Sequence, residues 1–396
     1  MQLICAHDDC FGCSLCHDVC PVQAIEMKND SGWYRPYINE NKCIDCGKCQ
    51  RSCPVNHQKE IPQNLHLPRE CYAAWCKDDI RHFHSSSGGL ATKIAEKFIA
   101  QGGMVAGVIY DAERQEAVHM ITDDLEDLSK MAKSKYMQSN KTGLWREIIA
   151  KAGNRPMLFF GVGCEVNVFK TLVTVDKKQN LFCVDLLCHG GSSSLLFKEH
   201  LQEVAPHKTV NNVTFRGGPE DCRFTVYEQG KVIYQEGQFE DVYFSEFMRH
   251  SIFAPRCYEC PFARTERGGD LTLADFWGLD KNILAKAEGK GTNLCLVNTD
   301  KGQQLLDMIR DDIHIFSRPL AEAVAGNETL QMPTAKPEGR EELWQLIPQI
   351  GFERAARQVY GDYYRKVCLR KMKAGLIRRL PAPIYKTLIW LKGRLK

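Results

Sequence analysis

The sequence of 396 residues lacks any apolar run long enough to form a membrane-spanning helix. Its opening residues, MQLICAHDDC, lack the basic start, the apolar core and the small-residue cleavage site of a secretory signal. We therefore expect neither an integral membrane protein nor an exported one. With 44% hydrophobic residues, the chain can bury sizeable cores, and its length indicates more than one domain.

Acidic residues are missing from the last part of the chain. Residues 365–396 hold eleven Lys or Arg and no Asp or Glu, and subtracting these charges from the net charge of +3 leaves −8 for the first 364 residues. The body is therefore acidic and the tail basic. Because an acidic body repels the phosphates that a basic tail attracts, we expect no nucleic acid among the partners.

Cysteine, by contrast, is abundant, with 19 residues. Without a secretory signal we expect a cytoplasmic protein, in which thiols stay reduced and available for metal. Eight of these cysteines form two ladders of the same spacing. They read Cys10-x2-Cys13-x2-Cys16-x3-Cys20-Pro21 and Cys43-x2-Cys46-x2-Cys49-x3-Cys53-Pro54.

This spacing is an iron–sulfur signature. Three closely spaced thiolates reach three irons of a cubane cluster, and in two-cluster ferredoxins the fourth cysteine of each ladder ligates the cluster of the other ladder. We therefore assign Cys53 to the first ladder's cluster and Cys20 to the second's. Zinc is disfavoured, because zinc modules present paired Cys-x2-Cys knuckles rather than triple ladders. Residues 1–60 are predicted to form a ferredoxin-type domain with two [4Fe-4S] clusters.

Beyond the ladders, the sequence predicts a second domain and a tail. The polar segment 55–68, with two prolines, has the composition of a linker. Strand-like runs then alternate with helical patterns, and a hairpin pattern surrounds Gly230, so we expect an α+β or α/β fold with a mixed sheet over residues 69–335. A helical basic tail is expected over 336–396. The expected strands are 104–110, 156–161 and 180–188, and the expected helices are 90–100, 144–152 and 194–204.

Four further cysteines fall where a parallel fold brings residues together. Cys164 and Cys188 follow predicted strands, and Cys257 and Cys260 form a Cys-x2-Cys pair. Because the carboxyl ends of parallel strands line one crevice, these four thiols are able to hold one cluster. The spacing alone leaves open that Cys164 and Cys188 are buried small hydrophobes and that the pair is a zinc knuckle.

Eight motifs occur in order between residues 86 and 299. They are Ser86-Ser-Gly-Gly-Leu-Ala-Thr92, Ser134-Lys-Tyr-Met-Gln-Ser139, Gly161-x-x-Cys164, Asp185-Leu-Leu-Cys-His-Gly190, Phe215-Arg216, Arg256-Cys-Tyr-Glu-Cys-Pro-Phe262, Asp270-Leu-Thr-Leu-Ala-Asp-Phe-Trp-Gly278 and Leu296-Val-Asn-Thr299. Together they resemble the coenzyme F420 hydrogenase/dehydrogenase beta-subunit family, in the bacterial form with an N-terminal dicluster ferredoxin. The resemblance spans roughly residues 1 to 330. It implies FAD and a third [4Fe-4S] cluster in the second domain, the cluster being held by Cys164, Cys188, Cys257 and Cys260.

Three positions depart from the family's pattern. Gly163 and Glu165 flank Cys164 where the family has proline and glutamine, and Ala274 precedes Asp275 where it has glycine. The ligand cysteines are retained. The departures bear on substrate identity and redox tuning rather than on ligation.

The resemblance directs the flavin to the Ser85–Gly89 turn, which opens a predicted helix whose free amides can hold a pyrophosphate. The residues alone leave open a plain serine N-cap. Lys135 would offset the cofactor's charge and Tyr136 would cover its ring, with a surface lysine and a core tyrosine as the alternatives. The predicted cofactor-binding residues are Ser87, Gly88, Gly89, Thr92, Lys135 and Tyr136.

The catalytic residues are not identified by the sequence. A nicotinamide site is not expected after the strand that ends at Gly161, because Val166 stands where the third glycine of the fingerprint belongs. His189 would donate a hydrogen bond to sulfur or a proton to substrate, and Asp275 would act as an acid. A structural histidine and a turn aspartate are the alternatives.

These patterns predict a cytoplasmic iron–sulfur flavoprotein oxidoreductase. Electrons would pass between a ferredoxin-like or other redox protein, the clusters and FAD, and reduce an unidentified small-molecule or glycan-related substrate. The alternatives are a non-catalytic electron-transfer subunit of a larger complex and an accessory protein of surface-polysaccharide biosynthesis. The basic tail, which contains Trp390 among leucines, favours peripheral contact with the inner face of a membrane, with packing on the body as the alternative.

Overall fold

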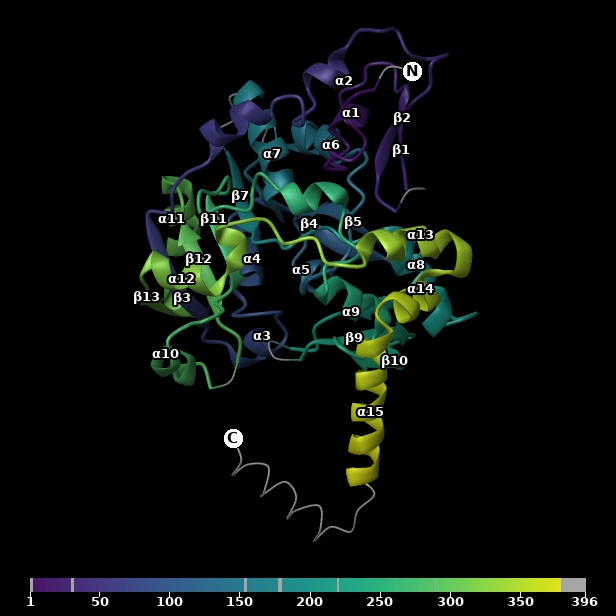
Figure 1. Cartoon of the computed structure of the whole chain (residues 1–396). Helices are drawn as coiled ribbons and strands as arrows, with labels where there is room; N and C mark the ends of the chain where they lie inside the picture. Colours follow the sequence, from purple (N-terminus) through teal and green to yellow (C-terminus); the bar gives the residue numbers. More distant parts are fainter. Residues whose placement is uncertain are drawn as a thin grey trace.

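A computed structural model describes residues 3–29, 32–152, 155–176, 180–218, 221–288 and 290–378. The two ladders (residues 10–21 and 43–54) and the strands between them form a small part at one end of the molecule (Figure 1). The helix α15 (Gly361–Arg378) leaves the body at the opposite end (Figure 1). Between them lies a mixed α/β body. The predicted fold class is thereby confirmed.

The small part repeats one local structure. Strands β1 (Ile25–Lys28) and β2 (Arg35–Ile38) pair antiparallel between the two ladders. Each ladder contains a four-residue helix, α1 (Leu15–Asp18) and α2 (Lys48–Arg51), that follows a residue in the left-handed region, Ser14 with φ 62° and Gly47 with φ 65°. The chain turns in the same way within both ladders, as two copies of one sequence pattern should.

The body is built on an eight-stranded mixed sheet of order β13-β3-β12-β11-β7-β6-β4-β5. The four strands β11, β7, β6 and β4 are parallel neighbours, and the strands on either side of this block are antiparallel. In chain order the strands are β3 (Glu70–Cys76), β4 (Met104–Asp111), β5 (Glu116–Thr122), β6 (Met157–Val162), β7 (Leu181–Leu186), β11 (Leu271–Asp275), β12 (Asn293–Val297) and β13 (Ile313–Ser317).

Both faces of the sheet are buried. Along β6, Leu158 packs with the helices α4 (Leu90–Ala100) and α11 (Asp300–Asp307), whereas Met157 and Phe159 pack on the opposite face. That second face is covered by α6 (Leu144–Lys151) and α7 (Gly163–Asp176), and, near β3, by α12 (Leu320–Gly326). Because side chains alternate along a strand, burial on both faces explains why the central strands are apolar throughout.

A second, three-stranded sheet lies beside the C-terminal helices. The predicted hairpin around Gly230 is confirmed, since β9 (Arg223–Glu228) pairs antiparallel with β10 (Lys231–Gly237), and β8 (Asn212–Thr214) extends the sheet. Its core is rich in aromatic side chains. The helices that share this core are α8 (Ser194–Val204), α9 (Val242–Met248), α13 (Arg340–Ile350) and α14 (Phe352–Val359).

The remaining elements are short. They are α3 (Asp79–Phe83), α5 (Leu128–Met131), α10 (Lys281–Lys286) and the 3-10 helices Gln58–Asn64, Pro255–Glu259, Arg310–Asp312 and Glu328–Leu330. The segment 55–68 is therefore not the plain linker that its composition predicts. It forms the first of these 3-10 helices, and His66 exchanges two backbone hydrogen bonds with Arg267 of the body, at 2.9 and 2.8 Å. The prolines and polar residues of this segment therefore belong to a connection that packs against the body.

The small part is docked on the body through Asp18, the last residue of α1. Its carboxylate accepts from the backbone amides of Gly143 and Trp145, both at 2.8 Å, at the start of α6. The indole of Trp145 donates in return to the carbonyl of Cys13 at 2.6 Å. A carboxylate from the ladder thus occupies the N-terminus of a body helix, where its charge is favourable.

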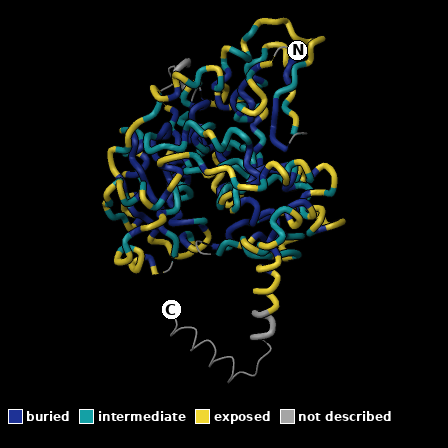
Figure 2. The backbone as a smooth tube through the Cα atoms, viewed as in Figure 1, coloured by how far each residue is buried: buried dark blue, intermediate teal, exposed yellow. Residues whose placement is uncertain are grey.

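Among the helices that the structure describes, none combines the length and the apolar character needed to cross a membrane. Helix α15 is mostly exposed along the part whose side chains are described (Figure 2). Trp390 and the other apolar residues beyond 378 lie outside the described residues.

Candidate iron–sulfur and cofactor sites

The first set of thiols combines three cysteines of the first ladder with one of the second. Cys10, Cys13, Cys16 and Cys53 are all buried and line one cavity. Burial raises the pKa of Cys16, and the thiols of Cys13, Cys10 and Cys53 raise it further. The fourth cysteine of the second ladder therefore lies with the first ladder, which is the crossed arrangement expected for two cubane clusters.

The second set is the counterpart, Cys20 with Cys43, Cys46 and Cys49. Burial raises the pKa of Cys49, and the neighbouring thiols of Cys20 and Cys43 add to it. The backbone amide of Ala24 donates to Cys20 Sγ at 3.2 Å. Cys43 and Cys46 are exposed, in contrast to the first set. A cluster held here lies at the surface.

The structure adds a fifth thiol to the first set that the spacing did not indicate. Cys5 hydrogen-bonds to both Cys10 and Cys53, and these bonds are the main reason why its own pKa is raised. The same bond is the largest cause of the lowered pKa of Cys10, about 6. Cys5 belongs to no ladder, so only the tertiary structure brings it here.

The third set brings together Cys164, Cys188, Cys257 and Cys260 from three separate segments. Burial raises the pKa of Cys188, and Cys257 and Cys260 raise it further. The pKa of Cys164 is raised by burial, by Glu165 and then by Cys260 and Cys188. The amide of Gly191 donates to Cys257 Sγ at 3.3 Å. The predicted convergence of these four cysteines is therefore present in the fold.

Two contacts position the loops that carry this set. A Cβ on Gly163 would lie 2.7 Å from the Cβ of Phe262, so the loops of Cys164 and Cys260 approach too closely for a larger residue at position 163. Arg267 pairs with the buried carboxylate of Asp185 at 2.7 Å and donates to the carbonyl of Phe262 at 2.6 Å. The glycine in place of the family's proline thus has a packing reason.

Glu165, the second departure from the family's pattern, is neutralised within the chain. Its carboxylate lies 2.9 Å from the ammonium of Lys141, which is itself buried. Burial opposes ionisation of Glu165, but Lys141 together with His119 holds the pKa of the carboxyl below its usual value. A charge beside Cys164 is thereby matched by an opposite charge.

The thiols fit an iron–sulfur cluster by their chemistry. A bound metal deprotonates coordinating thiols whose burial would otherwise keep them neutral. Within the described ranges, no three Cys, His, Asp or Glu side chains lie close enough to share a single metal ion. The four thiolates of a cubane bind four different irons and therefore stand farther apart.

A second site forms around Arg216, which the sequence singled out only as part of a motif. Its guanidinium donates to the carbonyl of Ser86 at 2.6 Å, to the hydroxyl of Tyr136 at 3.4 Å and to the carboxylate of Asp275 at 3.2 Å. The amide of Ser134 donates to Ser86 Oγ at 3.0 Å. Four of the eight motifs thus meet at one buried arginine, which is a feature of tertiary structure alone.

The other predicted flavin residues have structural partners. A Cβ on Gly88 would lie 2.5 Å from the carbonyl of Ala74, and Gly89 has φ +86°. The first amide of α4, that of Leu90, already donates to Asn293 Oδ1 at 3.2 Å.

Polar groups nearby differ in how they are used. The ammonium of Lys135 donates to four backbone carbonyls of residues 130–133 at 2.8 to 3.1 Å. The hydroxyl of Ser87 is buried and has no hydrogen-bond partner in the described structure, and Thr92 is half-buried. Ser87 is therefore the predicted flavin residue whose hydroxyl stays available, whereas Lys135 is engaged.

His189 follows Cys188 and lies between the third set and the Arg216 site. Its ring is parallel to that of His250, with centroids 6.3 Å apart. Burial lowers the pKa of His189, and the carboxylate of Asp275 acts in the opposite direction. The two catalytic candidates are therefore near each other.

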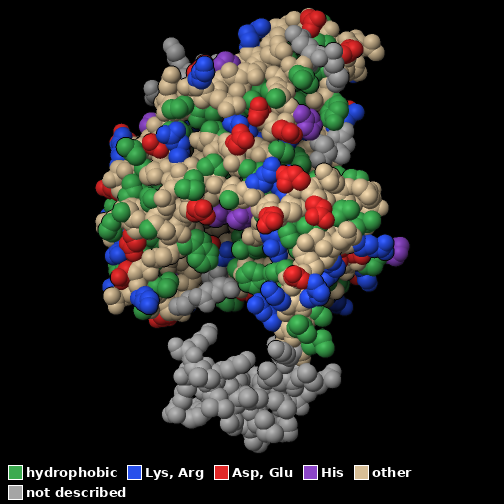
Figure 3. Space-filling model, viewed as in Figure 1, with side chains coloured by type: hydrophobic (Ala, Val, Ile, Leu, Met, Phe, Trp, Pro, Cys, Tyr) green, Lys and Arg blue, Asp and Glu red, His purple; other side chains and the backbone are tan. Residues whose placement is uncertain are grey.

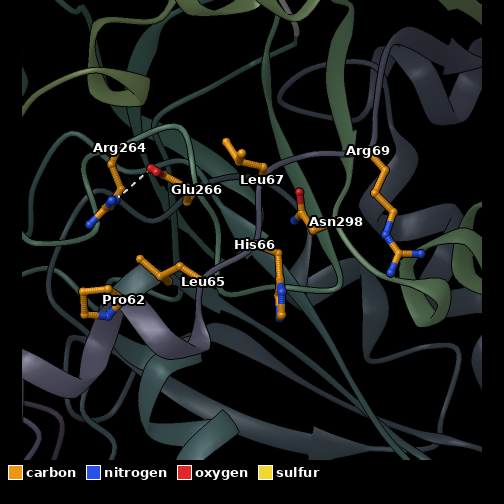
Figure 4. Close-up of a pocket in the computed structure, with 8 residues that line it drawn as sticks. All are labelled: Pro62, Leu65, His66, Leu67, Arg69, Arg264, Glu266 and Asn298. Carbon is orange, nitrogen blue, oxygen red and sulfur yellow. Dashed lines mark hydrogen bonds and ion pairs between the residues drawn. The ribbon is translucent and has the colours of Figure 1, made fainter.

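An open cavity of about 520 Å³ lies apart from these residues (Figure 4). One wall is the connection before β3, with His66 and Arg69, and another is the loop after Cys260, where Arg264 and Glu266 form an ion pair at 2.9 Å. None of the site residues predicted from the sequence lines it, although Asn298 of the last motif does.

Comparison with known families gives three matches along the chain. Residues 9–57 match the 4Fe-4S dicluster domain. Residues 71–143 and 154–322 match the N-terminal and C-terminal models of the coenzyme F420 hydrogenase/dehydrogenase beta subunit. The two beta-subunit models together span more than half of the chain.

Two curated proteins and one solved structure are similar to this chain. One subunit of the F(420)H(2) dehydrogenase of Methanosarcina mazei is 23% identical over 324 residues, which is 79% of this chain and 86% of that protein. One subunit of the Na(+)-translocating ferredoxin:NAD(+) oxidoreductase complex of Acetobacterium woodii is 42% identical over 63 residues, 16% of this chain and 18% of that protein. A chain of the F420-reducing [NiFe] hydrogenase complex from Methanosarcina barkeri has a TM-score of 0.47 at 16% identity, covering 78% of this chain and 94% of that chain.

Proposed function

Because this chain belongs to the coenzyme F420 hydrogenase/dehydrogenase beta-subunit family and carries a 4Fe-4S dicluster domain, we propose that it is an iron–sulfur flavoprotein that passes electrons from a redox partner to a substrate. Three clusters would be held by the three sets of thiols. The arrangement of these sets supports the proposal most directly. The second set has two exposed cysteines, the first set next to it is buried, and the third set is half-buried in the body.

The docking of the small part keeps the first and third sets close. The ring of Phe11 packs against that of Phe262, with centroids 5.7 Å apart. Phe11 is next to Cys10, and Phe262 is two residues after Cys260. The indole of Trp33 donates to the carbonyl of Gly191 at 3.3 Å, beside Cys257. The loops of both sets therefore belong to one packed interface, and we infer that electrons travel from the second set through the first to the third.

The Arg216 site is the place where we propose that FAD and substrate bind. When bound, a flavin accepts or donates two electrons, whereas iron–sulfur clusters exchange one at a time. Arg216 provides a guanidinium for an anionic group, although Asp275 offsets part of its charge, and the hydroxyls of Ser86 and Ser87 provide hydrogen bonds. We place the cofactor's charged part toward Arg216 rather than on the amide of Leu90, which Asn293 already binds.

Replacing Arg216 by glutamine tests this assignment. We expect anaerobically purified wild-type protein to contain about twelve irons and about one FAD per chain. R216Q should bind FAD at least about tenfold more weakly and retain less of it, because a desolvated charge-assisted contact contributes on the order of 1.5–3 kcal/mol, while iron stays unchanged. Flavin and iron are quantified on the same samples.

The matched control is R223Q, which removes an exposed arginine of β9 that pairs with Asp221. It should keep full flavin content. Full flavin content in R216Q would show that FAD binds elsewhere. Wild-type protein that contains no flavin would favour the second candidate function, a non-catalytic electron-transfer subunit. That candidate gains support from a relative that is named as one subunit of an F(420)H(2) dehydrogenase.

We also propose that the basic tail contacts a membrane. The protein would then be cytoplasmic and would bind the inner face of that membrane. Lys and Arg gather where α15 leaves the body (Figure 3). Arg365, Lys366 and Arg370 are exposed there. Each cation near an anionic surface contributes on the order of 1 kcal/mol.

We expect the full chain, but not one ending at Tyr364, to float with anionic vesicles at low salt. Neutral vesicles and high salt should reduce binding, since exposed charge is screened within about 8 Å at physiological ionic strength. The truncated chain serves as the control for contacts made by the body. If neither chain floats while truncation lowers the melting temperature, the tail packs on the protein and the membrane proposal fails.

A further inference from the structure

Arg35, the first residue of β2, is a buried cation in the interface between the small part and the body. It is 1% exposed. Its Nη1 donates to the carbonyl of Cys10 at 3.0 Å and to that of Tyr34 at 3.4 Å. Its Nε and Nη2 are buried with no hydrogen-bond partner in the described structure. No carboxylate of the described residues forms an ion pair with it.

Such a group is unfavourable unless a negative charge lies close by. A buried ion that has left water must be compensated by a counter-charge, and arginine does not deprotonate in proteins. The described residues offer carbonyl oxygens to one nitrogen only. We therefore look for the counter-charge in something that the polypeptide holds rather than in a carboxylate of the described residues.

Arg35 lies where loops of two thiol sets meet. Its Nη1 binds the carbonyl of Cys10, and the indole of Trp33, two residues earlier, binds the carbonyl of Gly191, whose amide donates to Cys257 Sγ. The pKa of Cys10 is lowered first by its bond with Cys5, and the positive charge of Arg35 lowers it further. Cys257, in the third set, has its pKa raised to about 11 by burial, and Arg35 opposes that rise. The cation is thus within electrostatic reach of the first set on one side and the third set on the other.

Lys141, another buried cation near these thiols, differs from Arg35 because it has a carboxylate partner. Its charge also acts on both sets, through Cys13 and Cys164. Lys141, however, is paired with Glu165 at 2.9 Å, so much of its field is cancelled. Arg35 has no carboxylate partner of this kind among the described residues.

We propose that Arg35 is the common counter-charge of the first and third sets, raising the reduction potentials of the clusters bound there and keeping them close together. The inference rests on the ligand assignment of the proposed function. A cubane held by four thiolates is an anion that gains one negative charge when it is reduced, so a nearby cation favours the reduced form. One electron leaving the first set arrives beside the same cation at the third, and no proton or further reactant is needed.

The test is a redox titration of the full anaerobic protein followed by electron paramagnetic resonance, comparing wild type with R35Q. At the potential where each wild-type cluster is half reduced, the ratio of reduced to oxidised should fall at least about tenfold in R35Q for both the first and the third set, which is about 59 mV for one electron. The second set should change less than about twofold. R35K retains the charge and should stay within about threefold of wild type.

R51Q is the matched control, because Arg51 donates to the carbonyl of Cys46 at 2.8 Å as Arg35 does to that of Cys10, but from an exposed position. It should leave the first and third sets unchanged. Unchanged potentials in R35Q, or a shift of one set alone, would overturn the bridge. If R35Q does not retain iron, R35K decides the question. A tenfold change in its ratio of reduced to oxidised cluster, in the first or the third set, would then overturn the proposal. A wild type with about eight irons would instead refute the third cluster itself.

Discussion

Replacing Cys257 by serine is expected to remove one cluster's worth of iron, from about twelve to about eight per chain, while the resonance signals of the two N-terminal clusters persist. The reason is that Cys257 lies in the body with Cys164, Cys188 and Cys260, whereas the first and second sets are built entirely from the small part. Iron and acid-labile sulfide are measured on protein purified without oxygen.

The control for this variant is C295S, which places the same hydroxyl at a fully buried cysteine of β12 that belongs to none of the three sets. It should retain about twelve irons, although burying an unsatisfied hydroxyl costs about 1–3 kcal/mol of stability. Unchanged iron in C257S would refute the third site. One zinc in place of about four irons would favour the zinc knuckle.

Replacing Cys20 by serine should disturb the cluster of the second ladder, although Cys20 belongs to the first. Cys20 lies with Cys43 and Cys49, and its sulfur accepts the amide of Ala24. Iron should fall by up to about four per chain, and the remaining signal should be that of the buried first set.

Two reference variants identify which cluster is lost. C46S removes a ligand of the second ladder and C13S one of the first. The spectrum of C20S is expected to match that of C46S, because crossed ligation places Cys20 and Cys46 in the same set. A match with C13S would contradict the crossed assignment and require each ladder to bind its own cluster.

Local pattern determined much of this fold. The predicted strands at 104–110, 156–161 and 180–188 and the predicted helices at 90–100, 144–152 and 194–204 are all present, with ends shifted by up to two residues. Each of them is specified by neighbouring residues, through apolar runs, helical periodicity and turn glycines. The ladders are local in the same sense, because ligand spacing is a property of a short segment.

The segment 55–68 shows where local pattern fails. Proline and polar residues occur in linkers and in packed connections alike, and the two β-bridge hydrogen bonds with Arg267 depend on a residue about two hundred positions away. Composition carries no information about such a distant partner.

By itself, the sequence determined the two ladders, the positions of the third set's cysteines and the alternation of strands and helices, because each follows from residues close together in the chain. Only the tertiary structure decided which charges meet. Arg35 binds the carbonyl of Cys10 from a buried position, Lys141 neutralises the carboxylate beside Cys164, and Arg216 joins Ser86, Tyr136 and Asp275. Electrostatic interaction depends on distance in space and on burial, and neither quantity is written in the spacing of residues along the chain.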